Sequence, residues 1–312
     1  MVRLGEPSGD CYNCNDDQNG VGEYRINHKI ILGHIIIRMD AVILGDSWVY
    51  GSDTWAFKLA KKQGWYNVSN LARSGATIND CREGQLSEVD KVDASTLFII
   101  HCGGNDLLRF VRRNPEKHIL DCLILQLGGQ PLFYTAAGLQ VSEGIVNLLT
   151  DLVTQHGARN FLVSSSTMSS SMPLCKYVML ATSPLGYSGT IDMVTEIVNN
   201  QLIDALLRFQ SQYNNISITY HDEGLICKCK KHELTDKWEY DGFHLCTSGH
   251  DILSEEAFLA LEESKPLKQF KRHTSVRVSG ANAPFTILSL VLVMALKSVY
   301  VLFAKIKRML FQ

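Results

Sequence analysis

The sequence predicts an α/β fold of three layers, in which a mostly parallel β-sheet is flanked by helices on both faces. Short, continuous apolar runs predict buried strands, and stretches with apolar residues at helical spacing predict helices between them. Strands and helices that alternate in this way are typical of a parallel sheet. The chain has 312 residues, of which 46% are hydrophobic, so it can bury one large core of this kind.

The elements follow one another along most of the chain. Strands are expected over residues 41–44, 65–71, 96–100, 160–163 and 216–220. Helices are expected over residues 53–64, 139–156 and 190–213. The segment 106–240 is long for a minimal domain of this type, so it must contain insertions, and insertions usually shape the substrate pocket.

Two of the predicted strands end at residues that suit catalysis. The run 41–44 stops at a Gly-Asp-Ser turn, which places the Ser47 hydroxyl on the rim of the sheet. The run 96–100 breaks at a pair of glycines and delivers Asn105 to the same edge. Ligands bind outside the carboxyl ends of the strands in open α/β sheets. We therefore expect Ser47 to be a nucleophile and the Asn105 amide to donate to an oxyanion.

Asp241 and His244 can activate this serine. A serine hydroxyl is a poor nucleophile at neutral pH and needs a base, which in turn needs a group that orients it. Because Asp241 and His244 are three residues apart, the carboxylate can accept from one imidazole nitrogen while the other faces Ser47. We interpret His101 and His250, which lie outside such a block, as structural.

Taken together, these segments resemble the SGNH hydrolase superfamily, also called the GDSL esterases and lipases, from about residue 39 to about residue 261. The resemblance implies a flavodoxin-like fold and gives the backbone N–H of Ser47 a place in the oxyanion hole. It gives the same role to Gly75, in NLARSGAT, and it places the Asn105 side chain beside them. Asp106, in the same block as Asn105, is expected to cap a helix.

The remaining block of the family supports the same interpretation. Asp241 and His244 match its Asp-x-x-His pair, which implies that residues 245–261 form the last helix of the domain. Trp48 stands where the family name expects leucine, at a position that packs behind the nucleophile. The resemblance implies an ester hydrolase that forms an acyl-enzyme on Ser47 and uses no metal or organic cofactor.

A zinc site is the alternative for the cysteines. Cys11 and Cys14 form one pair, and Cys227 and Cys229 form another close to His232. The two pairs are far apart in the sequence, so we disfavour zinc and predict no metal. Nine cysteines without regular spacing indicate a reducing compartment.

The substrate is the least defined part of the prediction. It is expected to be a small-molecule or lipid ester: a lipid, an acetylated sugar or a small acyl ester. The serine-rich stretch 164–173 follows a predicted strand and is a candidate wall of the pocket. The formal net charge of −2 gives no indication of nucleic-acid binding.

Both ends differ in composition from the central domain, which is expected over residues 39–264. Residues 1–38 form a polar extension that we expect to be disordered, and translation from Met39 is a further hypothesis. A basic linker over 265–284 leads to residues 285–304, and a basic tail over 305–312 follows.

The apolar segment 285–304 is long enough to span a membrane, and its only charged residue is Lys297. We favour a single-pass C-terminal membrane anchor with a cytoplasmic catalytic domain, which mildly favours a lipid substrate. An interfacial amphipathic helix on a peripheral cytoplasmic protein is the rival. Two functional alternatives remain open, namely a non-catalytic glycan- or lipid-binding protein on the same fold and a membrane-tethering protein.

Overall fold

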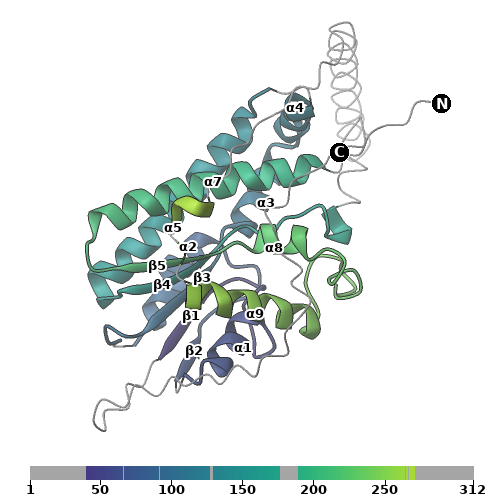
Figure 1. The fold of residues 1–312 in the computed structure, drawn as a ribbon. Helices are drawn as coiled ribbons and strands as arrows, with labels where there is room; N and C mark the ends of the chain where they lie inside the picture. The colour runs from purple at the N-terminus through teal and green to yellow at the C-terminus, as the bar shows by residue number, and fades with distance from the viewer. Residues whose placement is uncertain are drawn as a thin grey trace, which may run out of the picture. The chain divides into compact units, whose positions relative to one another are not determined.

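The computed structural model describes residues 40–270, except 66, 91, 127–128, 176–188, 264 and 266. The N-terminal extension, most of the basic linker, the candidate membrane segment 285–304 and the tail lie outside the described residues (Figure 1). Within the part of the chain that is described, no helix is both long and apolar enough to cross a membrane.

In the described residues, five strands form one parallel sheet with the order β2-β1-β3-β4-β5 (Figure 1). The strands are β1 (Ala41–Gly45), β2 (Val68–Asn70), β3 (Leu97–His101), β4 (Asn160–Ser164) and β5 (Ser217–His221). β1 and β3 are neighbours, and Gly45 pairs with His101 at their carboxyl ends. The predicted parallel sheet is therefore confirmed, and its register brings the Gly-Asp-Ser turn and the Asn105 loop to the same edge.

Helices cover both faces of this sheet (Figure 1). The helices are α1 (Trp55–Lys62), α2 (Ile78–Asp80), α3 (Gly104–Arg113), α4 (Pro115–Gln126), α5 (Leu132–His156), α7 (Gly189–Gln212), α8 (Glu223–Cys229) and α9 (Thr247–Glu263). Val42 and Leu44 point into the core beneath α5 and α7, whereas Ile43 points into the core beneath α1 and α9. The continuous apolar run of β1 is explained because both faces of the strand are buried.

The predicted helices match α1, α5, α7 and α9, although α5 begins earlier than expected. Helices α2, α3, α4 and α8 were not predicted from the sequence. A separate small core joins α3 and α4 to the first turns of α5 and α7, and Leu107, Phe133 and Val194 lie in it. These helices account for part of the predicted insertion between Asn105 and Asp241.

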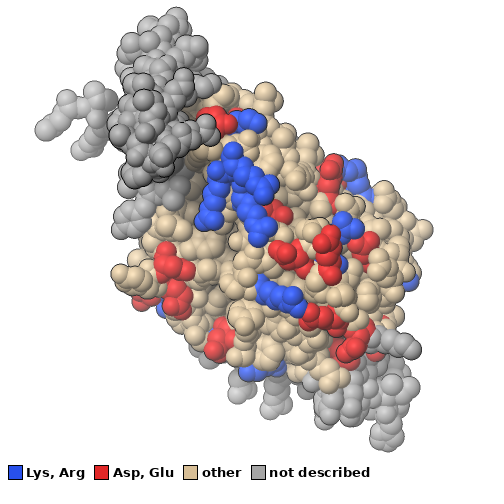
Figure 2. Space-filling model, turned by 180° about the vertical axis from the view of Figure 1, so that it is seen from behind, with Lys and Arg blue, Asp and Glu red and all other residues tan. Residues whose placement is uncertain are grey.

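Charged side chains of both signs lie close together on the face shown in Figure 2. Ion pairs such as Arg82 with Asp151, at 2.8 Å, link neighbouring elements of the fold. This mixture agrees with the near-neutral formal charge of the chain.

Candidate active site

Ser47 follows the end of β1, and contacts from β3 and Gln85 hold that end of the strand in place. A Cβ atom on Gly45 would lie only 2.1 Å from the carbonyl oxygen of His101, so the approach of β1 to β3 excludes any side chain there. The Gln85 amide is fully buried and binds both backbone groups of Gly45, the N–H and the C=O, at 2.8 Å each. These contacts fix the strand two residues before Ser47. Gln85 ends a π-helical turn, and no sequence signal indicated this role.

The structure brings Ser47, His244 and Asp241 into one hydrogen-bonded chain. Ser47 Oγ lies 2.7 Å from His244 Nε2, and His244 Nδ1 lies 2.5 Å from Asp241 Oδ2. A carboxylate can only accept a hydrogen bond, so Nδ1 carries the imidazole proton. Nε2 is then the acceptor for the Ser47 hydroxyl, which is the arrangement that a general base needs.

Asp241 is held in its ionised form by the turn that carries it. Its Oδ1 accepts hydrogen bonds from the backbone N–H groups of Phe243, at 2.8 Å, and His244, at 2.9 Å. Burial acts to raise the pKa of Asp241, but hydrogen bonds from the backbone and side chain of His244 and from Phe243 outweigh it and lower the pKa. The carboxylate is therefore ionised at neutral pH and able to orient His244.

Asn105 lies at the same edge of the sheet, in the first turn of α3. Gly103 caps this helix with a φ of +104°, a conformation that favours glycine. Asn105 Nδ2 donates to the carbonyl oxygen of Ala76 at 3.1 Å and lies 3.5 Å from Asp46 Oδ2. Gly75, with a φ of +75°, directly precedes Ala76. The Asn105 amide thus connects the Gly75 loop with the turn that carries Ser47.

Asp106 acts as a capping residue, but on a different helix from its own. Its Oδ2 accepts from the backbone N–H of Ile78 at 3.0 Å, at the start of α2. The same turn of α2 has a reciprocal capping box between Thr77 and Asp80. Asp106 therefore ties the segment after Gly75 to α3.

Comparison with known proteins agrees with this geometry. Residues 42–257 match the family described as GDSL-like Lipase/Acylhydrolase, and this match covers more than half of the chain. The chain belongs to this family. It is therefore an ester-hydrolysing enzyme, and Ser47, Asn105, Asp241 and His244 all fall within the matched range.

Solved structures similar to this GDSL-like protein include two from Streptomyces. Phospholipase A1 from Streptomyces albidoflavus NA297 is 11% identical, with a TM-score of 0.48, and the match covers 72% of this chain and 99% of that one. An extracellular lipase from Streptomyces rimosus is 14% identical, with a TM-score of 0.45 and coverage of 73% and 100%. A lipolytic protein of the G-D-S-L family from Veillonella parvula DSM 2008 is 14% identical, with a TM-score of 0.46 and coverage of 71% and 97%. A search of curated proteins finds no match.

The pocket of this GDSL-like protein opens beside Ser47. Asn105, Leu108 and Phe243 are among the residues that line it. The segment from Ser165 to Met168 lines the pocket as well, so the predicted serine-rich wall is confirmed. Trp48 is buried and packs against the rings of His101, Phe243, His244 and His250. It supports the site from behind, as the sequence predicted.

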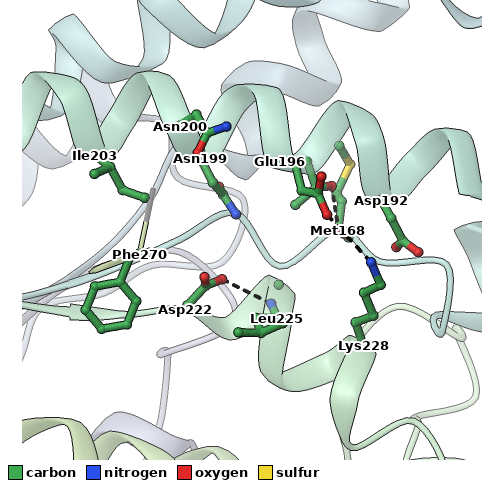
Figure 3. A pocket seen from close by; sticks show the side chains of 12 residues that line it. Met168, Asp192, Glu196, Asn199, Asn200, Ile203, Asp222, Leu225, Lys228 and Phe270 are labelled. Atoms are coloured by element: carbon green, nitrogen blue, oxygen red, sulfur yellow. Dashed lines mark hydrogen bonds and ion pairs between the residues drawn. The ribbon is translucent and has the colours of Figure 1, made fainter. Parts of the chain in front are cut away.

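A second pocket lies between α7 and α8, and Ser47 does not line it (Figure 3). Its charged side chains are paired within the protein: Lys228 lies 3.6 Å from Glu196, and Asp222 accepts from the backbone N–H of Leu225 at 3.0 Å. None of Ser47, Asp241 and His244 lines it. Met168 lines both pockets.

Over the described ranges, no group of three or more His, Cys, Asp or Glu side chains could hold a metal ion. Cys227 is buried, and burial raises the pKa of its thiol, which disfavours the thiolate that zinc requires. Cys11 and Cys14, the other pair considered from the sequence, lie outside the described residues.

Proposed function

We propose that this GDSL-like enzyme is a serine esterase that hydrolyses carboxylic esters through an acyl-enzyme on Ser47. The observation that carries the proposal is the continuous chain from Ser47 Oγ through His244 to Asp241, with contacts of 2.7 Å and 2.5 Å. A binding protein that does not turn over its ligand has no need of a serine in contact with an oriented histidine. The geometry therefore favours the enzyme over the non-catalytic alternative.

The proposed reaction has two steps. Ser47 Oγ attacks the ester carbonyl carbon while His244 Nε2 takes its proton, and His244 then gives this proton to the departing alcohol oxygen. Water attacks the acyl-enzyme with His244 again as the base, which releases the acid and restores Ser47. The backbone N–H groups of Ser47 and Gly75 and the Asn105 amide stabilise the oxyanion in both steps.

The wall of the pocket beside Ser47 supports a polar substrate. Ser166 and Thr167 lie on this wall, and their hydroxyl groups suit a polar alcohol half of the ester. We therefore favour a small acyl ester or an acetylated sugar over a long-chain lipid.

Hydrolysis of nitrophenyl esters by the full chain tests this function. We expect turnover, with the highest kcat/KM for acetyl to butyryl esters and a decline as the acyl chain lengthens, because the wall of the pocket carries hydroxyl groups. Acetylated sugars and long-chain lipid esters should then be compared under the same conditions. A folded protein that turns over none of these esters would contradict the proposal, and a preference for long chains would contradict the assigned substrate class.

Membrane anchorage through residues 285–304 is a separate part of the proposal. It rests on the length and apolar character of that segment, which lies outside the described residues. A cytoplasmic location of the catalytic domain rests on the irregularly spaced cysteines. Neither is needed for the chemistry at Ser47.

A further inference from the structure

Three ionisable side chains are buried together near Ser47 and take no part in the proposed reaction. Asp46 follows β1, His101 ends β3 and Glu223 begins α8, and these residues are 2%, 3% and 0% exposed. Burial of charged groups is unfavourable unless they are paired. Their presence so close to Ser47 therefore requires an explanation.

His101 lies between the two carboxyl groups. Its Nδ1 is 3.1 Å from Asp46 Oδ1, and its Nε2 is 3.4 Å from Glu223 Oε2. The second contact is an ion pair whose atoms are not aligned as a hydrogen bond. Glu223 is fixed in turn by the hydroxyl of Ser164, which donates to its Oε1. Every member of the cluster is thus held by a neighbour from another element.

The cluster keeps His101 positively charged. Burial acts to lower the pKa of His101, but the charges of Glu223 and Asp46 outweigh it and raise the pKa well above its ordinary value. The other histidines near the cluster are different: burial chiefly lowers the pKa of His221, on β5, and of His250, on α9, to about 4 each. At neutral pH, His101 is therefore the charged histidine among these three.

Asp46 links this cluster to the catalytic groups. Its Oδ1 also accepts from the backbone N–H of Trp48 at 3.1 Å, and its Oδ2 lies 3.5 Å from Asn105 Nδ2. A negative charge at Asp46 would repel the oxyanion that forms beside Ser47 and would compete with it for the Asn105 amide. The adjacent imidazolium of His101 offsets that charge and binds Oδ1 of Asp46, whereas Asn105 faces Oδ2.

We propose that His101, held between Asp46 and Glu223, is a positioning residue for ester hydrolysis: its imidazolium binds Asp46 and offsets its charge, so that the Asn105 amide can donate to the oxyanion. This inference rests on the proposed function of Ser47 and Asn105. His101 and Asp46 both line the pocket beside Ser47, but His101 is almost fully buried, and the role assigned to it acts through Asp46.

The test is steady-state hydrolysis of nitrophenyl acetate by the full chain, from neutral to alkaline pH. His101→Gln removes the charge but keeps a polar side chain. It should lower kcat by about tenfold or more, which corresponds to an increase of about 1.4 kcal/mol in the activation free energy, with little change in KM. Glu223→Gln should move the alkaline decline of kcat to lower pH, because His101 then loses its proton more easily. His118→Gln replaces a buried histidine on α4 and should leave the pH profile of the wild type unchanged.

A double-mutant cycle separates this role from a purely structural one. Asp46→Asn removes the charge that His101 neutralises, so His101→Gln should cause a smaller loss of kcat in that background than in the wild type. A folded His101→Gln enzyme with wild-type kcat would overturn the inference. If His101→Gln does not fold, the pH profile of Glu223→Gln tests the inference instead. An alkaline decline of kcat at the same pH as in the wild type would then overturn the inference. Absence of turnover in the wild type would instead refute the proposed function itself.

Discussion

Replacement of Ser47 by alanine is expected to lower kcat for nitrophenyl acetate by about 10⁴- to 10⁶-fold. The hydroxyl that contacts His244 Nε2 at 2.7 Å is lost, so no acyl-enzyme can form. The remaining rate should come from the oxyanion hole and substrate binding alone. Steady-state kinetics with enough enzyme to detect this residual rate is the appropriate measurement.

The matched control for this variant is Ser211→Ala, which removes an exposed hydroxyl at the end of α7. It should retain the kcat and KM of the wild type. Thermal unfolding should show that Ser47→Ala is folded, because the Ser47 side chain is not part of the core. A folded Ser47→Ala enzyme with near wild-type turnover would show that another residue is the nucleophile.

Replacement of Asn105 by alanine is expected to lower kcat by about 10²- to 10³-fold with a small change in KM, because an oxyanion donor acts mainly in the transition state. The variant also loses the bond from Asn105 Nδ2 to Ala76, so its unfolding should be measured alongside its kinetics. Asn105→Asp is the informative partner. It keeps the shape of the side chain but replaces the amide donor with a second carboxyl group near Asp46.

Asn105→Asp should be at least as impaired as Asn105→Ala, since it adds negative charge where the oxyanion forms. Two results would contradict the assigned role. One is an aspartate variant with near wild-type kcat. The other is an alanine variant that changes KM alone, which would indicate that Asn105 binds the substrate without stabilising the transition state.

The centre of the sheet was predictable because β1, β3 and nearly all of β4 are buried on both faces. Continuous apolar runs such as 41–44 and 161–163 are typical of strands in this position. The edge strand β2 was predicted as longer than it is, since one side of an edge strand has no partner to prolong the pairing. α4 and α8 were missed because short helices of mixed composition carry weak periodicity.

Some residues of the candidate site could be predicted from the sequence, and others could not. Ser47 lies in a Gly-Asp-Ser turn, and Asp241 and His244 form an Asp-x-x-His pair. Such short patterns can be recognised in the sequence alone. Gln85 and the Asp46–His101–Glu223 cluster are contacts between residues far apart in the chain. No local spacing marks such contacts, and they became visible only when β1, β3 and α8 were placed side by side.

The most direct test of the central claim is covalent trapping with a nitrophenyl phosphonate, which forms a stable adduct with an activated serine. The full-length enzyme should be incubated with this compound, assayed for residual activity, digested and analysed by mass spectrometry. If Ser47 is the nucleophile, each active enzyme molecule should carry one phosphonyl group, and this group should be located on Ser47. Activity should fall in proportion to labelling, and Ser47→Ala should form no adduct. An inactivated enzyme that carries its label on another residue would contradict it.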